Sequence, residues 1–343
     1  MHFNFLFPTD KVHHTTGCLI QGLHQLGHTV EANYTPSFPE NITSNGIFPP
    51  YSQSKINFIS ETKNFSKPLV IIDASHGWGN LEVQIEQEST KRNLVIINMD
   101  DNVMFVPHNE HIHVFNAHQN RFIKRWGKNY PLGFGPSQEA VDFAATFPTR
   151  KRKPAIFYNF RPTDRQCVRN TLELSLIPNL RKIIEVEQVF SSVKDYPNLL
   201  ASYQAMLCYG GLLYKDYRLN DTVFHDGVPL QVNFTSIPDY PVIGRFDSWR
   251  LYEAALFGVA PITLNFEKYG LDTGANPLPW VEYIPVEFDT VESLPEEIER
   301  RLKADPDFLI KIGNNARQWV LKNHTPVALA QRWISKLSEL NLI

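Results

Sequence analysis

The stretch SWRLYEAALFGVAPITL, residues 248–264, predicts a helix that leads directly into a buried strand. Residues 248–257 place apolar side chains at helical spacing, and Gly258 supplies the backbone freedom with which helices commonly end. Residues 259–264 are almost entirely apolar, which is typical of a parallel strand covered on both faces. The stretch therefore predicts an α/β fold built on a parallel sheet.

The first half of the chain repeats this alternation of strands and helices. Thr15 or Thr16 is expected to cap a helix that runs to Leu26, and Gly27 then ends it. Further apolar segments predict strands at residues 2–7, 29–32, 69–73, 94–99 and 113–116. Intervening helices are predicted at residues 81–90 and 120–126. Residues 34–66 are rich in Pro, Ser, Thr and Asn and predict a long irregular segment.

The second half also predicts an α/β unit, and the basic segment TRKRKP, residues 149–154, marks the boundary. Strands are predicted at residues 155–159 and 259–264, helices at 164–176, 248–257, 295–303, 306–323 and 327–340, and either type at 181–191 and 204–213. We therefore expect two Rossmann-like domains, residues 1–150 and 151–325, that face a central cleft. Residues 326–343 are expected to form a C-terminal helix that packs back toward the first domain.

The composition fits two globular cores. The chain has 343 residues, of which 43% are hydrophobic and 20% are charged, so it is long enough for two domains. Its 33 basic and 36 acidic side chains give a net charge of −3, which provides no overall positive field for nucleic acid. Three cysteines, an odd number, predict buried thiols rather than a disulfide framework. The opening apolar run is too short for a signal peptide and no run of about 18 apolar residues follows, which predicts a cytoplasmic protein without a transmembrane segment.

The sequence FRPTDR, residues 160–165, predicts an anion site where a strand gives way to a helix. A helix start offers unpaired N–H groups and a partial positive charge. Arg161 and Arg165 would add guanidinium donors suited to phosphate, and Arg169 lies one turn further along. Such a site suits a diphosphate. The alternative is a solvated helix start whose arginines pair with acidic side chains.

The start of the helix 248–257 carries a second candidate site. Asp247 or Ser248 can cap this helix. Arg250 and Glu253 are three residues apart and therefore share one of its faces. The carboxylate of Glu253 can accept two hydrogen bonds from a ribose diol, and Arg250 can meet a phosphate. The alternative is a plain intrahelical ion pair between these two side chains.

Candidates for a general base lie in the first half. Asp100 and Asp101 directly follow one predicted strand, and Asp73 ends another. His13 and His14 precede the first predicted helix. Any of these side chains could take a proton from an acceptor hydroxyl. The alternatives are that the aspartates cap the next element and that the histidines make helix-entry contacts.

The stretch SWRLYEAALFGVAPITL and the later NARQWVLKNHTPVALAQRWI resemble the C-terminal half of GT-B glycosyltransferases, in particular the family-1-like and CgeB-like groups. FRPTDR together with RLYE is also similar to the donor site of phage DNA β-glucosyltransferases. This resemblance implies that Arg161, Arg165 and Arg250 hold the diphosphate of a sugar donor and that Glu253 holds its ribose. It also implies that a strand-end aspartate, Asp100 in this sequence, is the base.

The predicted function is transfer of a sugar from a nucleotide-diphosphate sugar, with a UDP-sugar favoured, to an acceptor hydroxyl. Many retaining GT-B enzymes carry two glutamates separated by seven residues, and Arg245 occupies the first of these positions here if Glu253 is the second. This departure favours inversion of the sugar. Arginines and helix starts would neutralise the diphosphate, so no metal or other cofactor is predicted, and His108, His111 and His113 fit no strong ligand spacing. The acceptor stays open among a glycan, a protein, a small molecule and modified DNA.

Two alternative functions remain at this stage. A nucleotide-sugar epimerase or hydrolase on the same fold would turn over the donor without an acceptor. A non-catalytic GT-B-like binding or assembly module would bind a partner without turnover. A dinucleotide-dependent dehydrogenase is disfavoured because no G-x-G-x-x-G follows the first strand.

Overall fold

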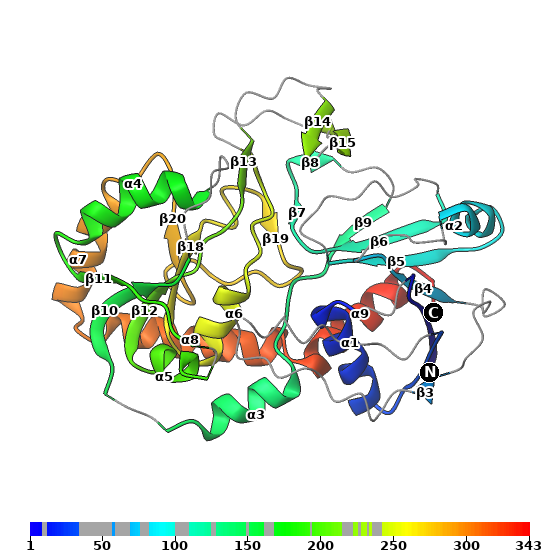
Figure 1. Ribbon diagram of the computed structural model, residues 1–343, viewed down its shortest axis with the longest axis horizontal. Helices are drawn as coiled ribbons and strands as arrows, with labels where there is room; N and C mark the ends of the chain where they lie inside the picture. Colours follow the sequence, from blue (N-terminus) through cyan, green and yellow to red (C-terminus); the bar gives the residue numbers. More distant parts are fainter. Residues whose placement is uncertain are drawn as a thin grey trace.

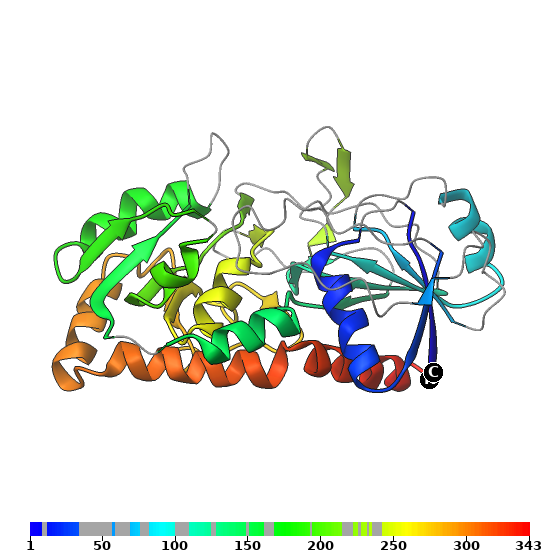
Figure 2. The same ribbon diagram turned by 60° about the horizontal axis from the view of Figure 1, so that its bottom comes forward.

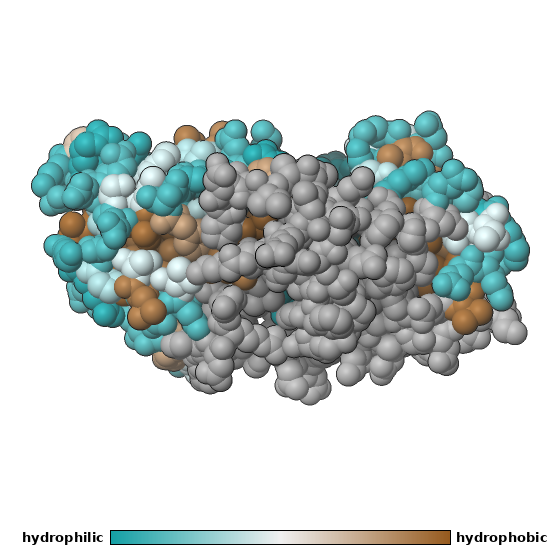
Figure 3. Space-filling model, turned by 90° about the horizontal axis from the view of Figure 1, so that it is seen from above, coloured by the Kyte–Doolittle hydropathy of each residue, from teal (hydrophilic) through white to brown (hydrophobic). Residues whose placement is uncertain are grey.

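The computed structural model describes residues 1–8, 12–33, 57–58, 69–75, 82–99, 110–124, 128–148, 151–160, 168–192, 194–214, 222–225, 228–231, 233–234 and 242–343. These residues form two lobes, each built on a parallel sheet (Figure 1). On the face seen in Figure 3, hydrophilic side chains predominate on the described residues at both ends of the molecule, and apolar ones form separate spots. The described part of the chain contains no helix long and apolar enough to cross a membrane.

The first sheet has seven strands in the order β3-β2-β1-β4-β5-β6-β9, and all neighbouring pairs are parallel. Its strands are β1 (His2–Leu6), β2 (Thr29–Ala32), β3 (Asn57–Phe58), β4 (Val70–Asp73), β5 (Leu94–Asn98), β6 (Ile112–Asn116) and β9 (Lys128–Pro131). The helices α1 (His14–Gln25) and α2 (Glu82–Ser89) flank this sheet (Figure 1). Helix α3 (Gln138–Thr146) follows β9 in the chain and lies beside the second lobe (Figure 1), where the ring of Phe143 is 6.4 Å from that of Phe257. The strand order reverses between β1 and β4, as in doubly wound folds, so the carboxyl ends of these two strands flank a natural binding position.

The second sheet has five parallel strands in the order β11-β10-β12-β18-β20. Its strands are β10 (Lys153–Tyr158), β11 (Glu185–Gln188), β12 (Tyr203–Leu207), β18 (Ala260–Leu264) and β20 (Ile284–Val286). Its helices are α4 (Val168–Leu180), α5 (Tyr196–Leu200), α6 (Trp249–Leu256), α7 (Leu294–Ala304) and α8 (Phe308–Asn323). The order reverses between β10 and β12. The opening stretch is confirmed as a helix–glycine–strand unit, because α6 ends before Gly258, whose φ is +65°, and β18 follows.

Helix α9 (Pro326–Glu339) returns the chain to the first lobe and packs against α1. Figure 2 shows α8 and α9 running in succession along one side of the molecule, from the second lobe to the first. Trp333 of α9 is buried, with its ring 5.5 Å from that of Phe3 and 6.0 Å from that of Phe115. The apolar core on this face of the first sheet is continuous with the core of the second lobe. A smaller apolar cluster, which includes Ile85 of α2, lies on the opposite face.

The prediction of a helix at residues 120–126 is wrong for residues 120–124, which the structure describes. Residues 119–124 instead form the short strands β7 (Gln119–Asn120) and β8 (Ile123–Lys124), which pair with β19 (Leu271–Asp272) and β16 (Asn233–Phe234) of the second half. The buried Asn120 amide donates to the carbonyls of Ile243 and Tyr269, at 2.7 and 3.1 Å. Long-range pairing therefore satisfies the backbone groups that a helix would have satisfied locally, and the fold supplies acceptors for the Asn120 side chain.

Other expectations differ in detail from the structure. Helix α1 begins at His14, and its capping residue is His13, whose ring Nδ1 accepts from the backbone N–H of Thr15 at 3.2 Å. The segments left unassigned contain β11, β12 and the first residues of β13 (Leu212–Tyr214), which pairs with β17 (Val242–Gly244). The hairpin β14 (Thr222–His225) and β15 (Val228–Gln231) completes the second half.

Of the predicted irregular segment 34–66, all but β3 lies outside the described residues, as do residues 149–150 of the predicted boundary and the first residues of the helix predicted at 164–176. Cys18 and Cys208 are buried and free, whereas Cys167 lies outside the described residues.

Gly22 allows α9 to approach α1 closely, and its replacement tests this packing. A Cβ atom at Gly22 would lie 1.9 Å from the carbonyl oxygen of Pro326, which belongs to the backbone and cannot rotate away. We expect Gly22→Ala to lower the free energy of unfolding by about 1–3 kcal/mol, the usual cost of overpacking. Urea unfolding measures this change. Gln25→Ala, at an exposed position of the same helix, is the control, and an equal loss in both variants would contradict the proposed close contact.

His324, which directly follows α8, predicts a loss of stability in acid. Its ring is fully buried, with Nδ1 2.9 Å from the carbonyl oxygen of Phe134 and Nε2 3.2 Å from that of Ala275. Burial, assisted by the positive charge of Arg332, lowers the pKa of His324 to about 3. The unfolded chain therefore takes up the proton first, and the free energy of unfolding should fall as the pH drops below about 6.5, by up to about 1.4 kcal/mol per pH unit.

Denaturant unfolding between pH 7 and pH 4 measures this slope. In His324→Gln the slope should be shallower than in the wild-type protein, because the titrating ring is gone. His111→Gln, at a half-exposed ring, should keep the wild-type slope. Identical slopes in all three proteins would show that His324 does not take part in acid unfolding.

Candidate functional site

The candidate site lies at the carboxyl edge of the second sheet, where its strand order reverses. Asn159 follows β10, and residues 208–211 follow β12. Helices α4 and α6 both begin at this edge, because the N–H group of Val168 donates to the carbonyl of Gly211 at 3.1 Å and Arg250 reaches Asn159. In doubly wound sheets ligands bind at this kind of position, outside the strand ends.

Arg250 points from the first turn of α6 to the end of β10. Its Nε donates to Oδ1 of Asn159 at 2.6 Å, and the side chain is partly buried. Asn159 is a neutral partner, so this hydrogen bond orients the guanidinium without cancelling its charge. Arg250 is thus held in place as a cation at the reversal point of the sheet, as a phosphate ligand requires.

Glu253 lies one turn further along α6 and is 1% exposed. Its Oε2 accepts a hydrogen bond of 2.7 Å from the hydroxyl of Tyr196 in α5. The hydrogen bonds of Glu253 and Arg250 therefore lead to different elements. A ribose diol would have to reach a carboxylate that already packs against Tyr196, so the ribose role stays a prediction.

Arg169 and a pair of glycines also belong to this edge. A Cβ atom at Gly210 would lie 3.5 Å from Nη2 of Arg169 and 3.9 Å from Cβ of Ser248. The guanidinium of Arg169 lies 5.5 Å from the ring centre of Phe160, within cation–π distance. Gly211 has a φ of +116°, which side chains rarely adopt. Two consecutive glycines after an apolar strand are a signal for close backbone approach that is visible in the sequence.

Ser248 and Asp247 precede α6. Ser248 holds the capping position, but its side chain makes no capping hydrogen bond. The buried carboxylate of Asp247 accepts from the N–H groups of Phe134 and Ser248, at 3.0 and 3.1 Å, and from the hydroxyl of Tyr252 at 3.2 Å. The N–H group of Asp247 donates to Nδ1 of His118 at 2.9 Å. Asp247 thereby connects the start of α6 to residues 118 and 134 of the first half.

The start of α1 meets the start of α6 through aromatic rings. The ring of His14 lies edge-on to Trp249 at 5.1 Å, and the ring of His13 stacks on Trp249 at 6.1 Å and on Phe134 at 5.7 Å. The rings of Phe134 and Trp249 stack at 4.4 Å with an angle of 3°. The structure therefore brings the predicted base His14 next to the helix that carries Ser248 and Arg250.

The surroundings of His14 define its protonation. His14 is buried, and burial lowers its pKa to about 4, so the ring is neutral near pH 7. Its Nε2 lies 3.4 Å from Sγ of Cys18. His13, by contrast, is only partly buried. A neutral ring is able to accept a proton, although a pKa near 4 makes it a weak base.

Several predicted site residues cannot be placed. Arg161, Arg165, Asp100 and Asp101 lie outside the described residues. Asp73 is described, and its Oδ1 accepts from the N–H and the hydroxyl of Ser75, at 3.0 and 2.5 Å. The hydroxyl of Ser75 in turn accepts from the N–H of Met99 at 2.9 Å, so this aspartate joins the ends of β4 and β5. Asp73 thus bonds the turn that follows β4, and its role as a base stays a prediction.

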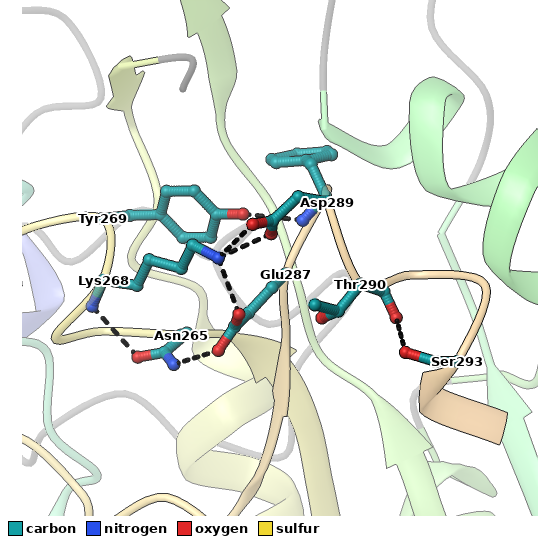
Figure 4. A network of polar contacts seen from close by, with 8 residues as sticks. Asn265, Lys268, Tyr269, Glu287, Asp289, Thr290 and Ser293 are labelled. Atoms are coloured by element: carbon teal, nitrogen blue, oxygen red, sulfur yellow. Dashed lines mark hydrogen bonds and ion pairs between the residues drawn. The ribbon is translucent and has the colours of Figure 1, made fainter. Parts of the chain in front are cut away.

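A network of charged side chains joins the carboxyl ends of β18 and β20 (Figure 4). Nζ of Lys268 lies 2.7 Å from Oε2 of Glu287 and 2.5 Å from Oδ1 of Asp289. Asn265 donates to the other oxygen of Glu287 at 2.6 Å. These contacts raise the pKa of Lys268 above its usual value and lower that of Asp289. Two carboxylates neutralise Lys268, so this lysine fixes the two loops and does not offer a free cation to a diphosphate.

Of the histidines at positions 108, 111 and 113, whose spacing fits no strong metal-ligand pattern, the two that the structure describes do not belong to this edge of the second sheet. His113 lies on β6, where its Nδ1 is 3.1 Å from the hydroxyl of Tyr130, and Nδ1 of His111 is 3.2 Å from Oδ1 of Asn93. His108 lies outside the described residues. Among the residues that the structure describes, no three His, Cys, Asp or Glu side chains gather in a way that could hold a metal ion.

Two parallel α/β lobes joined by a final helix that returns to the first lobe define the GT-B fold of glycosyltransferases. A glycosyltransferase from Rickettsia africae ESF-5 is similar over 99% of both chains, with 12% identity and a TM-score of 0.52. HepE from Anabaena, in complex with UDP and glucose, aligns over 99% of this chain and 100% of its own at 13% identity and a TM-score of 0.46. The Rickettsia structure supports the fold assignment. No protein-family model matches the sequence, and no curated protein sequence matches it significantly.

Replacement of Tyr196 tests whether the hydrogen bond from its hydroxyl to the buried carboxylate of Glu253 stabilises the fold. Tyr196→Phe removes that donor and leaves a buried carboxylate oxygen with one hydrogen bond fewer. We expect the free energy of unfolding to fall by about 1–3 kcal/mol. The control is Tyr203→Phe, which removes a hydroxyl that bonds the more exposed Glu187 and should cost less than about 1 kcal/mol. Equal losses would argue against a special role for the Tyr196–Glu253 pair.

Proposed function

We propose that this protein transfers a sugar from a nucleotide-diphosphate sugar to an acceptor hydroxyl. The observation that carries the proposal is the oriented cation Arg250 at the reversal point of the second sheet, next to the starts of α4 and α6. The GT-B fold, which glycosyltransferases share, supports the same conclusion. The donor would lie on the second lobe and the acceptor on the first.

The chemistry asked of the second lobe is stabilisation of the leaving diphosphate. Arg250, Arg169 and the two helix starts would place positive charge and N–H groups where negative charge develops. The segment that carries Arg161 and Arg165 joins Phe160 to Val168, and both of these residues lie at the same edge. We propose these two arginines as further phosphate ligands, Ser248 and Glu253 as donor-binding residues, and a reaction that needs no metal.

The first lobe would supply the base. We propose His14, Asp100 and Asp101 as candidates, of which His14 is described and lies against Trp249 of α6. Asp100 and Asp101 follow β5 in the sequence. We propose inversion with a single base, because the glutamate pair of retaining relatives is not present in the sequence. UDP is the nucleotide we favour.

A thermal-shift titration tests the donor site directly. Purified protein is titrated with UDP, GDP, ADP, CMP and dTDP and with their common sugar conjugates, in EDTA and then with added Mg²⁺. A ligand at about 100 times its dissociation constant should stabilise the fold by about 2.7 kcal/mol. A response to UDP compounds in EDTA supports the proposal. A well-folded sample that responds to none of them would contradict it and favour the non-catalytic module.

Variants of α6 then connect binding to turnover. Arg250→Met should reduce kcat/KM for the donor by about 10²-fold, since one charged donor to the diphosphate is lost. Glu253→Gln retains an oxygen that can accept from Tyr196 and should raise the KM for the donor by about tenfold. Arg300→Met, at an exposed ion pair with Glu297, is the control and should leave both constants unchanged.

The same assay separates the other functions and the stereochemical outcome. Donor consumption without any acceptor would identify a hydrolase or epimerase and contradict transfer. With an acceptor found by screening, the anomeric configuration of the product shows whether the sugar is inverted. Unchanged kinetics in both α6 variants would overturn the site assignment even if transfer is observed.

A further inference from the structure

A cavity of about 490 Å³ lies where α9 joins the two lobes, apart from the residues proposed to bind the donor. Its walls come from the first lobe through Phe115 and Tyr130, from the second lobe through Gly274 and Lys322, and from α9 itself. The volume is within the range of small-molecule sites, which is about 300–1,000 Å³. A ligand here would touch both lobes and the helix between them.

Arg332 of α9 lines this cavity and has an unusual environment. Both terminal nitrogens of its guanidinium are buried, and neither has a hydrogen-bond partner among the residues that the structure describes. The carboxylate of Asp272 acts on Arg332 through its charge, but no hydrogen bond joins the two side chains. Oδ1 of Asp272 accepts instead from the N–H of Gly274 at 2.7 Å. Buried guanidinium groups normally make several hydrogen bonds, and leaving their donors unused is costly.

Two further residues with donor groups, Trp333 and Lys322, line the same cavity. The indole N–H of Trp333 is buried and, within the described part of the chain, has no acceptor. Lys322, near the end of α8, also lines the cavity, and its charge acts on the carboxyl of Glu282, where it opposes the rise in pKa that burial causes. Lys336 differs from Lys322, since its Nζ lies 2.6 Å from Oε1 of Glu339. Two cations and an N–H donor thus share one small cavity, and aromatic rings form part of its wall.

We infer that this cavity binds the phosphate group of a small phosphate monoester, held by Arg332 and Lys322. A phosphate monoester carries about two negative charges near pH 7, which two cations can balance. Its oxygens accept several hydrogen bonds, so they match the unused donors of Arg332 and Trp333. Tyr130 and Phe115 suit the carbon skeleton of the ester. The inference does not depend on the proposed glycosyl transfer, since none of its residues belongs to the proposed donor site.

Isothermal titration of the full chain tests the site. The probes are inorganic phosphate, glycerol 3-phosphate and glucose 6-phosphate at low millimolar concentration, with sodium chloride keeping the ionic strength constant. Glucose tests for recognition of the sugar alone, and acetate tests for recognition of a carboxylate. We expect saturable binding of the phosphate esters and none of glucose or acetate.

Variants separate this site from a general effect of anions. Arg332→Met and Lys322→Met should each weaken phosphate-ester binding by about tenfold or more, the usual loss for a charged hydrogen bond. Arg332→Met should also raise the Tm in buffer alone, because it removes a buried cation that lacks hydrogen-bond partners. Lys311→Met, on α8 but outside the cavity, is the matched control and should bind as the wild-type protein does.

Four outcomes would overturn the inference. They are no binding of any phosphate ester, equal binding by wild type and both cavity variants, equal binding of acetate, and loss of binding in Lys311→Met. If Arg332→Met fails to fold, Lys322→Met decides the question. A thermal shift with nucleotides that persists in Lys322→Met, together with lost phosphate-ester binding, would show that the two sites are separate. Failure of the donor proposal would appear only in the nucleotide titration.

Discussion

The buried carboxylate of Asp247 is the contact on which the arrangement of the two lobes depends. It accepts three hydrogen bonds, from Phe134, Ser248 and Tyr252, and its own N–H donates to His118. Burial raises the pKa of this carboxyl, while the three donors oppose the rise. A carboxylate without these donors would be expensive to bury. The two halves must therefore meet in one orientation to satisfy it.

That orientation determines the environment of α6. With Asp247 fixed, Trp249 stacks on Phe134 and meets the rings of His13 and His14, while Arg250 points the other way, to Asn159. The same helix thus contacts the first lobe with one residue and the second sheet with the next. The cations of the second lobe differ in what they can offer a ligand. Lys268 is neutralised by two carboxylates, whereas Arg250 is oriented by a neutral amide.

Local sequence signals predicted the elements that their own residues determine, such as helix ends at glycine, and the strands that are buried on both faces. The apolar strands β4, β5 and β18, and the glycine stop after α6, follow directly from residue type. The short strands at 119–124 do not, because their partners lie more than a hundred residues away in β16 and β19. The same limit applies to the site. The pair Arg250 and Glu253 is visible as a helical spacing, but their partners Asn159 and Tyr196 are brought in by the fold. The sequence around Asp247 predicts only a helix cap, and its role as an acceptor between the lobes could not be predicted from it.

Because α9 returns to the first lobe, most of that lobe is synthesised long before the helix that covers it. Helix α1 ends at Gln25, and the helix that covers it begins at Pro326. At a synthesis rate of about 5–20 residues per second, α9 is synthesised roughly 15–60 s after α1. The apolar face that packs against Trp333 stays uncovered during this interval. During this interval Phe3, Phe5 and Phe115 must be shielded by other means. Newly made chains are therefore most exposed to misassociation along this one face, and chaperone contacts should concentrate there until the last helix emerges.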